Sequence, residues 1–447
     1  MVGRKIFAGT APFVIALAIG SAQADAIDDY VTAQMRKQHI PGLALAVIRD
    51  GKAIKVQGYG LANVETNTPA KPDSVFKIGS VSKQFIATGV MVLVNDGKVA
   101  VDDKIGKYLE GSPEIWQDIT VRHVLTHTSG LVRESPGFSA MQAQSDAEVI
   151  KAAYQTPLRF QPGEKFEYCN LGYFILAEII RKASGQEWPA FMEQRVFKPL
   201  GMNDTRTTDM TAVIPRRADG YVYSNGKLQN GATVISLRPS GAFISTANDL
   251  VKWNAALDSG TVLPKPVLEQ MWTRVKLNDG TEQPYGFGWY LDKAGTHSQV
   301  RHGGSLAGFR SEYTRLTDDN LSVIVLTNVD GARTDAIAVN VAANYIKDLL
   351  PKRTAAKVDP EALAQYTGRY QFAPGYVIEI VRQGGGLSLE YAPMGQQIEL
   401  RPLSDASFFA PDDTRAEYVF VKDAAGAVTH ISVRDGGNEI SRATRVP

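Results

Sequence analysis

The sequence has a single cysteine and six histidines, and neither sign of charge is in excess. One cysteine cannot form an internal disulfide. The scattered histidines have no Cys or His neighbours at ligand spacing, so no metal site is indicated. The 48 Lys and Arg residues balance 47 Asp and Glu residues, which argues against nucleic acid or an anionic membrane as a partner. The sequence implies no cofactor.

Long apolar runs are also scarce. The clearest one, Ile6 to Gly20, is shorter than the roughly 18 to 20 residues that a membrane span needs. It follows the basic residues Arg4 and Lys5 and precedes Ala22-Gln23-Ala24, which is typical of a signal-peptide cleavage site. We therefore expect residues 1–24 to be a cleaved signal peptide and the protein to be periplasmic or secreted. The alternative is a membrane-spanning anchor, which the length of the run disfavours.

The 447 residues, of which 44% are hydrophobic, have the composition of a globular protein with two or three domains. The first part of the chain mixes strand and helix patterns. We expect strands at Gly42–Ile48, Ala53–Tyr59, Gly286–Leu291, Arg310–Leu316 and Leu321–Asn328. We expect helices at Ser80–Val94, Leu171–Ala183 and Ala336–Leu350, and one from a Thr246-Ala247-Asn248-Asp249 capping box to Leu257.

The pattern changes after a linker that runs from Pro351 to Pro360. Short strand-like runs then recur at roughly ten-residue spacing or a little more, at Tyr376–Val381, Leu387–Tyr391, Tyr418–Val421 and Val428–Val433. Regular short strands separated by turn residues predict a small antiparallel barrel or sandwich. We therefore expect one domain over residues 25–352 and a second, all-β domain over residues 361–447.

Ser80 and Lys83 open the buried helix and lie one turn apart on one face of it. A serine hydroxyl needs a neighbouring base to become a nucleophile, and a lysine can serve once burial lowers its pKa. The chain contains three Ser-x-x-Lys pairs, and chance alone predicts about one or two. Ser74 to Lys77 enters a strand pattern and Ser224 to Lys227 crosses a turn. Only Ser80 has a helix to fix its geometry.

Two further elements carry side chains suited to hydrolysis. Tyr168-Cys169-Asn170 offers a phenol as a base and an amide that can hold both the lysine and a substrate carbonyl. His302-Gly303-Gly304-Ser305 has glycines that admit a substrate backbone, and a backbone N–H there could join that of Ser80 in an oxyanion hole. Taken alone, Tyr168 is more often a packed aromatic and His302 more often a structural histidine. Cys169, as a lone cysteine, fits a small buried hydrophobe better than a nucleophile.

The stretch from Ser74 to Lys83 closely resembles the first motif of class C β-lactamases and their esterase, D-aminopeptidase and DD-peptidase relatives. Tyr168-Cys169-Asn170 resembles their Tyr-x-Asn motif. Leu125-Thr126-His127-Thr128-Ser129-Gly130 and Tyr285-Gly286-Phe287-Gly288-Trp289 are also typical of this penicillin-recognising superfamily. The resemblance covers about residues 26–350, and the all-β region resembles lipocalin-like barrels attached to some of these peptidases.

The resemblance implies an α+β fold, in which helices flank an antiparallel sheet and a helical lobe faces it, followed by the barrel. It implies acylation of Ser80, a base drawn from Lys83 and Tyr168, and substrate or oxyanion contacts from Asn170, His302, Gly304 and Ser305. His302 stands where class C β-lactamases carry the lysine of Lys-Thr-Gly, which weakens recognition of a penicillin carboxylate.

We therefore expect an exported serine hydrolase that acts on small esters, amides or D-amino-acid peptides. A β-lactamase and a non-catalytic penicillin-binding receptor are the alternatives. The partner expected in each case is a small molecule or a short peptide.

Overall fold

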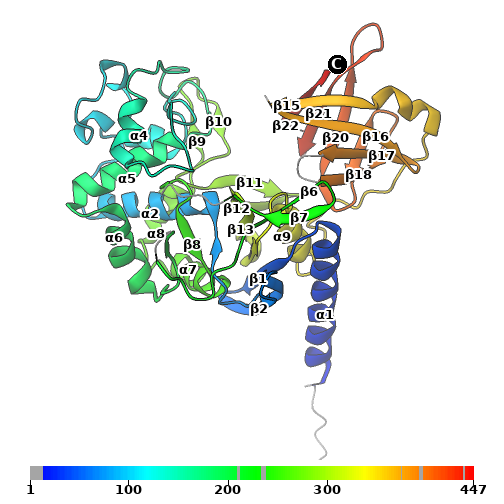
Figure 1. Cartoon of the computed structure of the whole chain (residues 1–447), viewed down its shortest axis with the longest axis horizontal. Coiled ribbons are helices and arrows are strands. Elements are labelled where there is room, and N and C mark those ends of the chain that lie inside the picture. Colours follow the sequence, from blue (N-terminus) through cyan, green and yellow to red (C-terminus); the bar gives the residue numbers. More distant parts are fainter. Residues whose placement is uncertain (1–13, 209–211, 233–237, 374, 392–395, 436–437) are drawn as a thin grey trace, which may run out of the picture.

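One antiparallel sheet of seven strands, in the order β11-β12-β13-β14-β1-β2-β3, organises the larger part of the chain (Figure 1). The computed structural model describes residues 14–208, 212–232, 238–373, 375–391, 396–435 and 438–447. The strands of the sheet are β1 (Gly42–Arg49), β2 (Lys52–Asn63), β3 (Thr68–Pro69), β11 (Tyr290–Ala294), β12 (His297–Leu306), β13 (Phe309–Leu316) and β14 (Leu321–Thr327).

The two faces of the sheet are covered by different helices. Successive side chains of a strand point to opposite faces, and alternate residues of the buried strand β1 accordingly join two separate cores. Leu43, Leu45 and Val47 pack with α1 (Val14–Lys37) and α9 (Thr334–Ala343). The intervening residues of β1 join the core that contains α2 (Ser82–Asn95) and α7 (Ala247–Ser259).

A helical lobe is built on the second of these cores. Its central helix, α5 (Leu171–Ser184), packs against α2, and nine of its fourteen residues are buried. The remaining helices are α3 (Val121–Leu125), α4 (Asp146–Ala152), α6 (Trp188–Met192) and α8 (Lys265–Met271). Small hairpins and short pairings complete the lobes, namely β4 (Phe76–Lys77), β5 (Arg206–Thr207), β6 (Tyr221–Ser224), β7 (Lys227–Asn230), β8 (Phe243–Ser245), β9 (Val275–Lys276) and β10 (Glu282–Gln283).

The C-terminal region is a closed antiparallel barrel of strands β15 to β22 around its own hydrophobic core (Figure 1). The strands are β15 (Gly368–Ala373), β16 (Tyr376–Gln383), β17 (Gly386–Tyr391), β18 (Gln396–Pro402), β19 (Ser407–Ala410), β20 (Asp413–Lys422), β21 (Val428–Asp435) and β22 (Asn438–Val446). This arrangement confirms the predicted fold class: helices flanking an antiparallel sheet, a helical lobe and an all-β barrel.

Polar contacts tie the barrel to α9 and the loop before it. The Arg333 guanidinium lies 3.2 Å from the Asp413 carboxylate, and Arg415 lies 3.2 Å from Asp335. Asn340 donates to the Asp412 carbonyl at 2.7 Å. Arg415 also holds Asp413 of its own strand at 2.8 Å, and both side chains are less than 10% exposed. The barrel therefore docks through Arg333, Asp413 and Arg415, which are largely removed from water, and through Asp335, whose side chain is 45% exposed.

Two predicted element boundaries and one predicted capping box are wrong. The strand expected from Gly286 begins only at Tyr290, because Gly286 to Trp289 form a turn in which Gly288 has a φ of +79°. The helix expected to reach Leu350 ends at Ala343. Thr246 caps α7 by accepting from the Asp249 N–H, but the Asp249 carboxylate accepts from Asp204 N–H at 2.8 Å instead of closing a capping box.

Part of the predicted signal peptide, residues 1–13 with Arg4 and Lys5, lies outside the described residues. The backbone of α1 runs without a break from Val14 through the predicted cleavage position to Lys37. Within the described ranges, none of the helices combines the length and apolarity needed to cross a bilayer.

Candidate active site

Ser80 and Lys83 lie at the start of the most deeply buried helix. Ser80 belongs to a single 3-10 turn, Gly79–Val81, and α2 follows directly at Ser82. Lys83 Nζ lies 3.2 Å from Ser80 Oγ. The Lys83 side chain is fully buried, whereas Ser80 remains partly exposed. The hydroxyl is therefore open to solvent on one side and contacts an amine on the other.

Two glycines bring β12 against this turn. A β-carbon at Gly79, whose φ is +51°, would lie 2.6 Å from the backbone nitrogen of Ser305. A β-carbon at Gly304 would lie 2.0 Å from the Ile78 carbonyl oxygen. Only glycine fits at either position without displacing backbone. The approach places the Ser305 backbone beside the segment that carries Ser80, and Ser305 itself is exposed.

Lys83 Nζ has three hydrogen-bond acceptors around it. An ammonium would donate to all three, whereas a neutral amine keeps its two N–H bonds to Asn170 Oδ1 at 2.8 Å and the Ser240 carbonyl at 3.0 Å and accepts from the Ser80 hydroxyl. Burial, reinforced by the positive charge of Arg238, holds the pKa of Lys83 well below its usual range. The amine is thus prepared to be neutral and to accept a proton.

Tyr168 responds to burial in the opposite direction. Its ring centroid lies 4.6 Å from Lys83 Nζ. Burial raises the pKa of Tyr168 well above 10, and a hydrogen bond with Ser80 only partly opposes the effect. Burial therefore favours the uncharged forms of both side chains over an ammonium–phenolate pair.

The ring of His302 belongs to a buried hydrogen-bonded chain. His302 Nδ1 donates to the Gly303 carbonyl at 2.7 Å, so its Nε2 accepts from the Tyr285 hydroxyl at 3.0 Å. His127 Nδ1 accepts from the Cys169 N–H at 3.1 Å, so its Nε2 donates to the same hydroxyl at 3.2 Å. Both imidazoles are neutral in this pattern, and burial lowers the pKa of His302 to about 3.

With both its nitrogens engaged and its side chain buried, the His302 ring offers no free donor or acceptor to a substrate. The pairing of β12 with β11 ends at Arg301, so the backbone of β12 from His302 onward is unpaired on that side among the described residues. Substrate contact at His302 remains a prediction, and it would involve this backbone rather than the buried ring.

Asn170 is oriented by residues that the sequence did not single out. Its Nδ2 donates to Glu134 Oε1 at 2.6 Å, which turns Oδ1 toward Lys83. Arg238 Nη2 donates to both oxygens of Glu134 at 2.8 Å. The pair lies within Coulombic range of Lys83, where the Glu134 charge raises the pKa of the amine and the Arg238 charge lowers it.

The rival motifs do not form sites. Ser74 Oγ accepts from the Lys71 N–H, while Lys77 Nζ lies 5.6 Å from the centre of the Phe309 ring. Ser224 and Lys227 face each other across the turn between β6 and β7. Cys169 is buried, and burial raises the pKa of its thiol to about 12, so it is a poor nucleophile.

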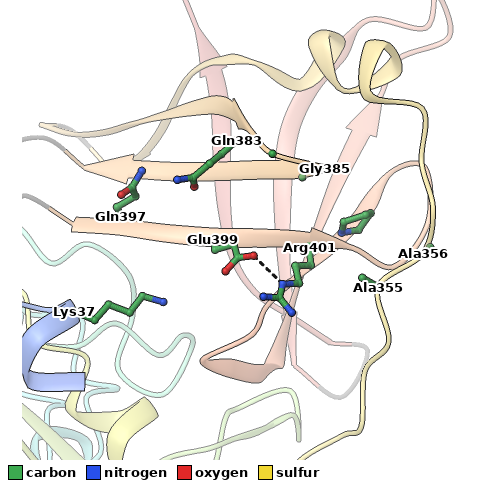
Figure 2. Close-up of a pocket in the computed structure, with 11 residues that line it drawn as sticks. Lys37, Ala355, Ala356, Gln383, Gly385, Gln397, Glu399 and Arg401 are labelled. Atoms are coloured by element: carbon green, nitrogen blue, oxygen red, sulfur yellow. Dashed lines mark hydrogen bonds and ion pairs between the residues drawn. The ribbon is translucent and has the colours of Figure 1, made fainter. Parts of the chain in front are cut away.

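The described residues contain no group of three or more His, Cys, Asp or Glu side chains placed to hold a metal ion. Two cavities of about 580 and 550 Å³ lie away from Ser80. The larger is lined by the barrel, the linker and the end of α1, and Figure 2 shows Lys37 facing Glu399 and Arg401 across it. Neither contains a residue predicted to act in catalysis.

Comparisons with known proteins identify the family of each region of the chain. The model of the family described as Beta-lactamase matches residues 27–345, and that of a domain of unknown function, DUF3471, matches residues 352–443. Penicillin-binding protein 4* of Bacillus subtilis (strain 168) is 30% identical, over 92% of this chain and 96% of its own. A D-aminopeptidase of Gluconobacter oxydans (strain 621H) is 27% identical, over 80% of this chain and 68% of its own.

The same fold occurs in a solved structure that extends over both regions. The octameric penicillin-binding protein homologue from Pyrococcus abyssi superposes with a TM-score of 0.68 at 24% identity, over 94% of this chain and all of the other. At that identity the likeness concerns the fold alone.

Proposed function

Because this chain belongs to the β-lactamase family of serine hydrolases, we propose that it cleaves small esters or amides, D-amino-acid peptides among them, through an acyl-enzyme on Ser80. The observation that carries the proposal is the contact of the fully buried Lys83 amine with the partly exposed Ser80 hydroxyl at 3.2 Å. The Arg4 and Lys5 n-region, the apolar run and the Ala22-Gln23-Ala24 pattern support export of this hydrolase.

In acylation, Ser80 Oγ attacks the substrate carbonyl carbon while its proton passes to the neutral Nζ of Lys83. The Oγ–C bond forms and the carbonyl electron pair moves onto oxygen. The backbone N–H groups of Ser80 and Ser305, which lie on adjacent segments, stabilise that oxyanion. When the bond to the leaving group breaks, the leaving atom is protonated. The Tyr168 hydroxyl, which hydrogen-bonds with Ser80, donates that proton and is reprotonated by the Lys83 ammonium.

In deacylation, water attacks the acyl carbon and gives its proton to Lys83, which is again neutral. The Oγ–C bond breaks, the acid product departs and Ser80 Oγ recovers a proton from the ammonium. Asn170 holds the Lys83 amine in position during both steps, because its Oδ1 accepts from Nζ at 2.8 Å. The base proposed for both steps is thus Lys83, with Tyr168 as proton donor.

The substrate class follows from the relatives and the third motif. One relative is named a D-aminopeptidase, and another a penicillin-binding protein. His302 supplies no cation to a penicillin carboxylate, since burial holds its pKa at about 3. We therefore place esters and amides ahead of β-lactams as substrates.

Stopped-flow hydrolysis of p-nitrophenyl acetate tests the proposal. The protein should release a burst of nitrophenol close to one equivalent, and Ser80→Ala should abolish it. Cys169→Ala is the matched control and should keep the burst, because the thiol is buried and protonated. A burst that survives in Ser80→Ala, or an acetyl group found by mass spectrometry on another residue, would contradict the proposal.

Replacing Glu134 by glutamine should move the acid limb of the kcat/KM profile to lower pH. The carboxylate raises the pKa of Lys83, and its loss also leaves Arg238 without its counter-ion beside the amine. Without the carboxylate, the positive charge of Arg238 is unopposed and the pKa falls further, so the amine becomes neutral at lower pH. Glu193→Gln, an exposed residue paired with Lys198, should leave the limb in place. A limb that stays fixed or moves upward in Glu134→Gln would show that Glu134 is only structural.

A further inference from the structure

Most ionisable side chains around Ser80 are either paired with an opposite charge or uncharged, and one is not. Glu134 and Arg238 neutralise each other through a two-oxygen contact. His302 is neutral, and burial lowers the pKa of Lys83 well below its usual range. Arg133 is the exception, because no carboxylate among the described residues lies within ion-pair distance of its guanidinium.

Arg133 is held firmly against the second motif. Its carbonyl accepts from the backbone N–H groups of Asn170 at 2.9 Å and Leu171 at 3.2 Å. The centre of its guanidinium lies 5.2 Å from the centroid of the Tyr168 ring, a cation–π contact. Its Nη1 lies 3.5 Å from the Tyr168 carbonyl oxygen. The residue is nonetheless exposed, so most of its donors face solvent.

The field of Arg133 reaches the reacting groups. Its charge lowers the pKa of Lys83 and opposes the rise in the pKa of Tyr168. Tyr168 also hydrogen-bonds with Ser80. Tyr168 therefore contacts both the guanidinium of Arg133 and the hydroxyl of Ser80.

We propose that Arg133 is a substrate-binding residue that selects esters and amides carrying a carboxylate near the scissile bond. This inference rests on the proposed hydrolysis at Ser80 and narrows its substrate class. A guanidinium presents paired N–H donors that match the two oxygens of a carboxylate. The Arg133 guanidinium attracts the substrate carboxylate, which the neutral His302 cannot do, and it belongs to a different segment of the chain. A free ammonium at the same place is repelled, so substrates with a free amino group there are disfavoured.

Two pairs of substrates test the proposal on either side of the scissile bond. On the acyl side, mono-p-nitrophenyl glutarate is compared with its methyl ester. On the leaving-group side, m-carboxyphenyl acetate is compared with its methyl ester. The acid should have the higher kcat/KM in at least one pair, and the pair that responds locates the anion. That preference should fall on the order of tenfold in Arg133→Ala, reverse in Arg133→Glu and be partly kept in Arg133→Lys.

Lys182→Ala is the charge-matched control. This exposed lysine lies on α5, about 17 Å along the helix axis from Leu171, and its loss should leave the preference unchanged. Added salt should weaken the preference in the unmodified protein, because an exposed charge is screened.

The inference is overturned if neither acid is preferred, or if Arg133→Ala retains the preference. In either case a nitrophenol burst that Ser80→Ala abolishes would leave the hydrolase function standing. A burst that persists in Ser80→Ala would overturn both together.

Discussion

Replacing Lys83 by methionine is expected to lower kcat/KM for p-nitrophenyl acetate by about a thousandfold, the middle of the range for loss of a general base. Methionine has a similar length and is apolar, so it fills the buried space while removing the proton acceptor 3.2 Å from Ser80 Oγ. The hydroxyl would then have to lose its proton to solvent. Steady-state kinetics, with circular dichroism to verify folding, measure the effect.

The pH profile separates loss of the base from loss of structure. Only the neutral amine accepts a proton, so kcat/KM of the unmodified protein should rise as pH increases through the lowered pKa of Lys83. It should then stay level until the phenol of Tyr168 ionises, which burial delays to well above pH 10. The residual activity of Lys83→Met should lack the rise at low pH.

Lys77→Met supplies the matched control. Lys77 is also a buried lysine three residues after a serine, with a pKa that burial lowers, but its Nζ faces the Phe309 ring. This variant should keep the acid limb of the profile. If Lys83→Met retained that limb, or if both variants lost activity equally, Lys83 would not be the base.

Local sequence patterns were sufficient for much of the sheet and for the buried helix. The turn residues Asp50-Gly51 and Asp318-Asp319-Asn320 mark two hairpins, and β1–β2 and β13–β14 are paired across them. The mainly apolar segment from Phe85 to Val94 lies within α2. These elements can be predicted because the residues that determine each one are close together in the sequence.

Other elements depend on contacts distant in sequence. A β-carbon at Gly288 would lie 2.8 Å from the Lys83 carbonyl, so the turn that delays β11 is imposed by α2. In the barrel, β15, β18 and β22 were not predicted, because polar residues interrupt their apolar alternation. The strand β19 was not predicted because it has only four residues and no alternation. Closure pairs β15 with β22, roughly seventy residues apart, which no local pattern reveals.

The site shows the same division. Ser80 with Lys83, and Tyr168 with Asn170, are short motifs that the fold brings together through Lys83 Nζ. Ser240 contributes only a carbonyl, which any residue could provide. Glu134 and Arg238 are more than a hundred residues apart and follow no pattern. The choice of Lys83 over Tyr168 as the proposed base depends on burial, which is a property of the folded chain.

The largest stability effect is expected from Arg415→Met in the barrel. Arg415 donates from Nε and Nη2 to the two oxygens of Asp413, at 2.8 and 2.9 Å, and both side chains are buried. The variant leaves the Asp413 carboxylate buried with Arg333, at 3.2 Å, as its charged partner and with the backbone N–H of residue 415 at 3.4 Å. Removing one member of a buried ion pair costs about 3 to 5 kcal/mol, and we expect about 3 kcal/mol because Arg333 stays.

Urea unfolding followed by two probes would measure this loss and locate it. The five tryptophans, all before the linker, report only on the sheet and helical lobe. Far-ultraviolet circular dichroism reports on the barrel as well. If docking couples the two regions, both transitions of Arg415→Met should move to lower urea; if the barrel unfolds alone, only the dichroism should move.

Arg442→Met is the control on the same barrel. Arg442 pairs with Glu439 at 2.9 Å, but its side chain is 57% exposed, and a surface pair contributes less than about 1 kcal/mol. Equal destabilisation by the two variants would contradict the assignment of Arg415 to a buried network. If the fluorescence transition moves in Arg415→Met and not in Arg442→Met, the barrel stabilises the region that carries Ser80. The reason is that Arg415 also contacts Asp335 of α9.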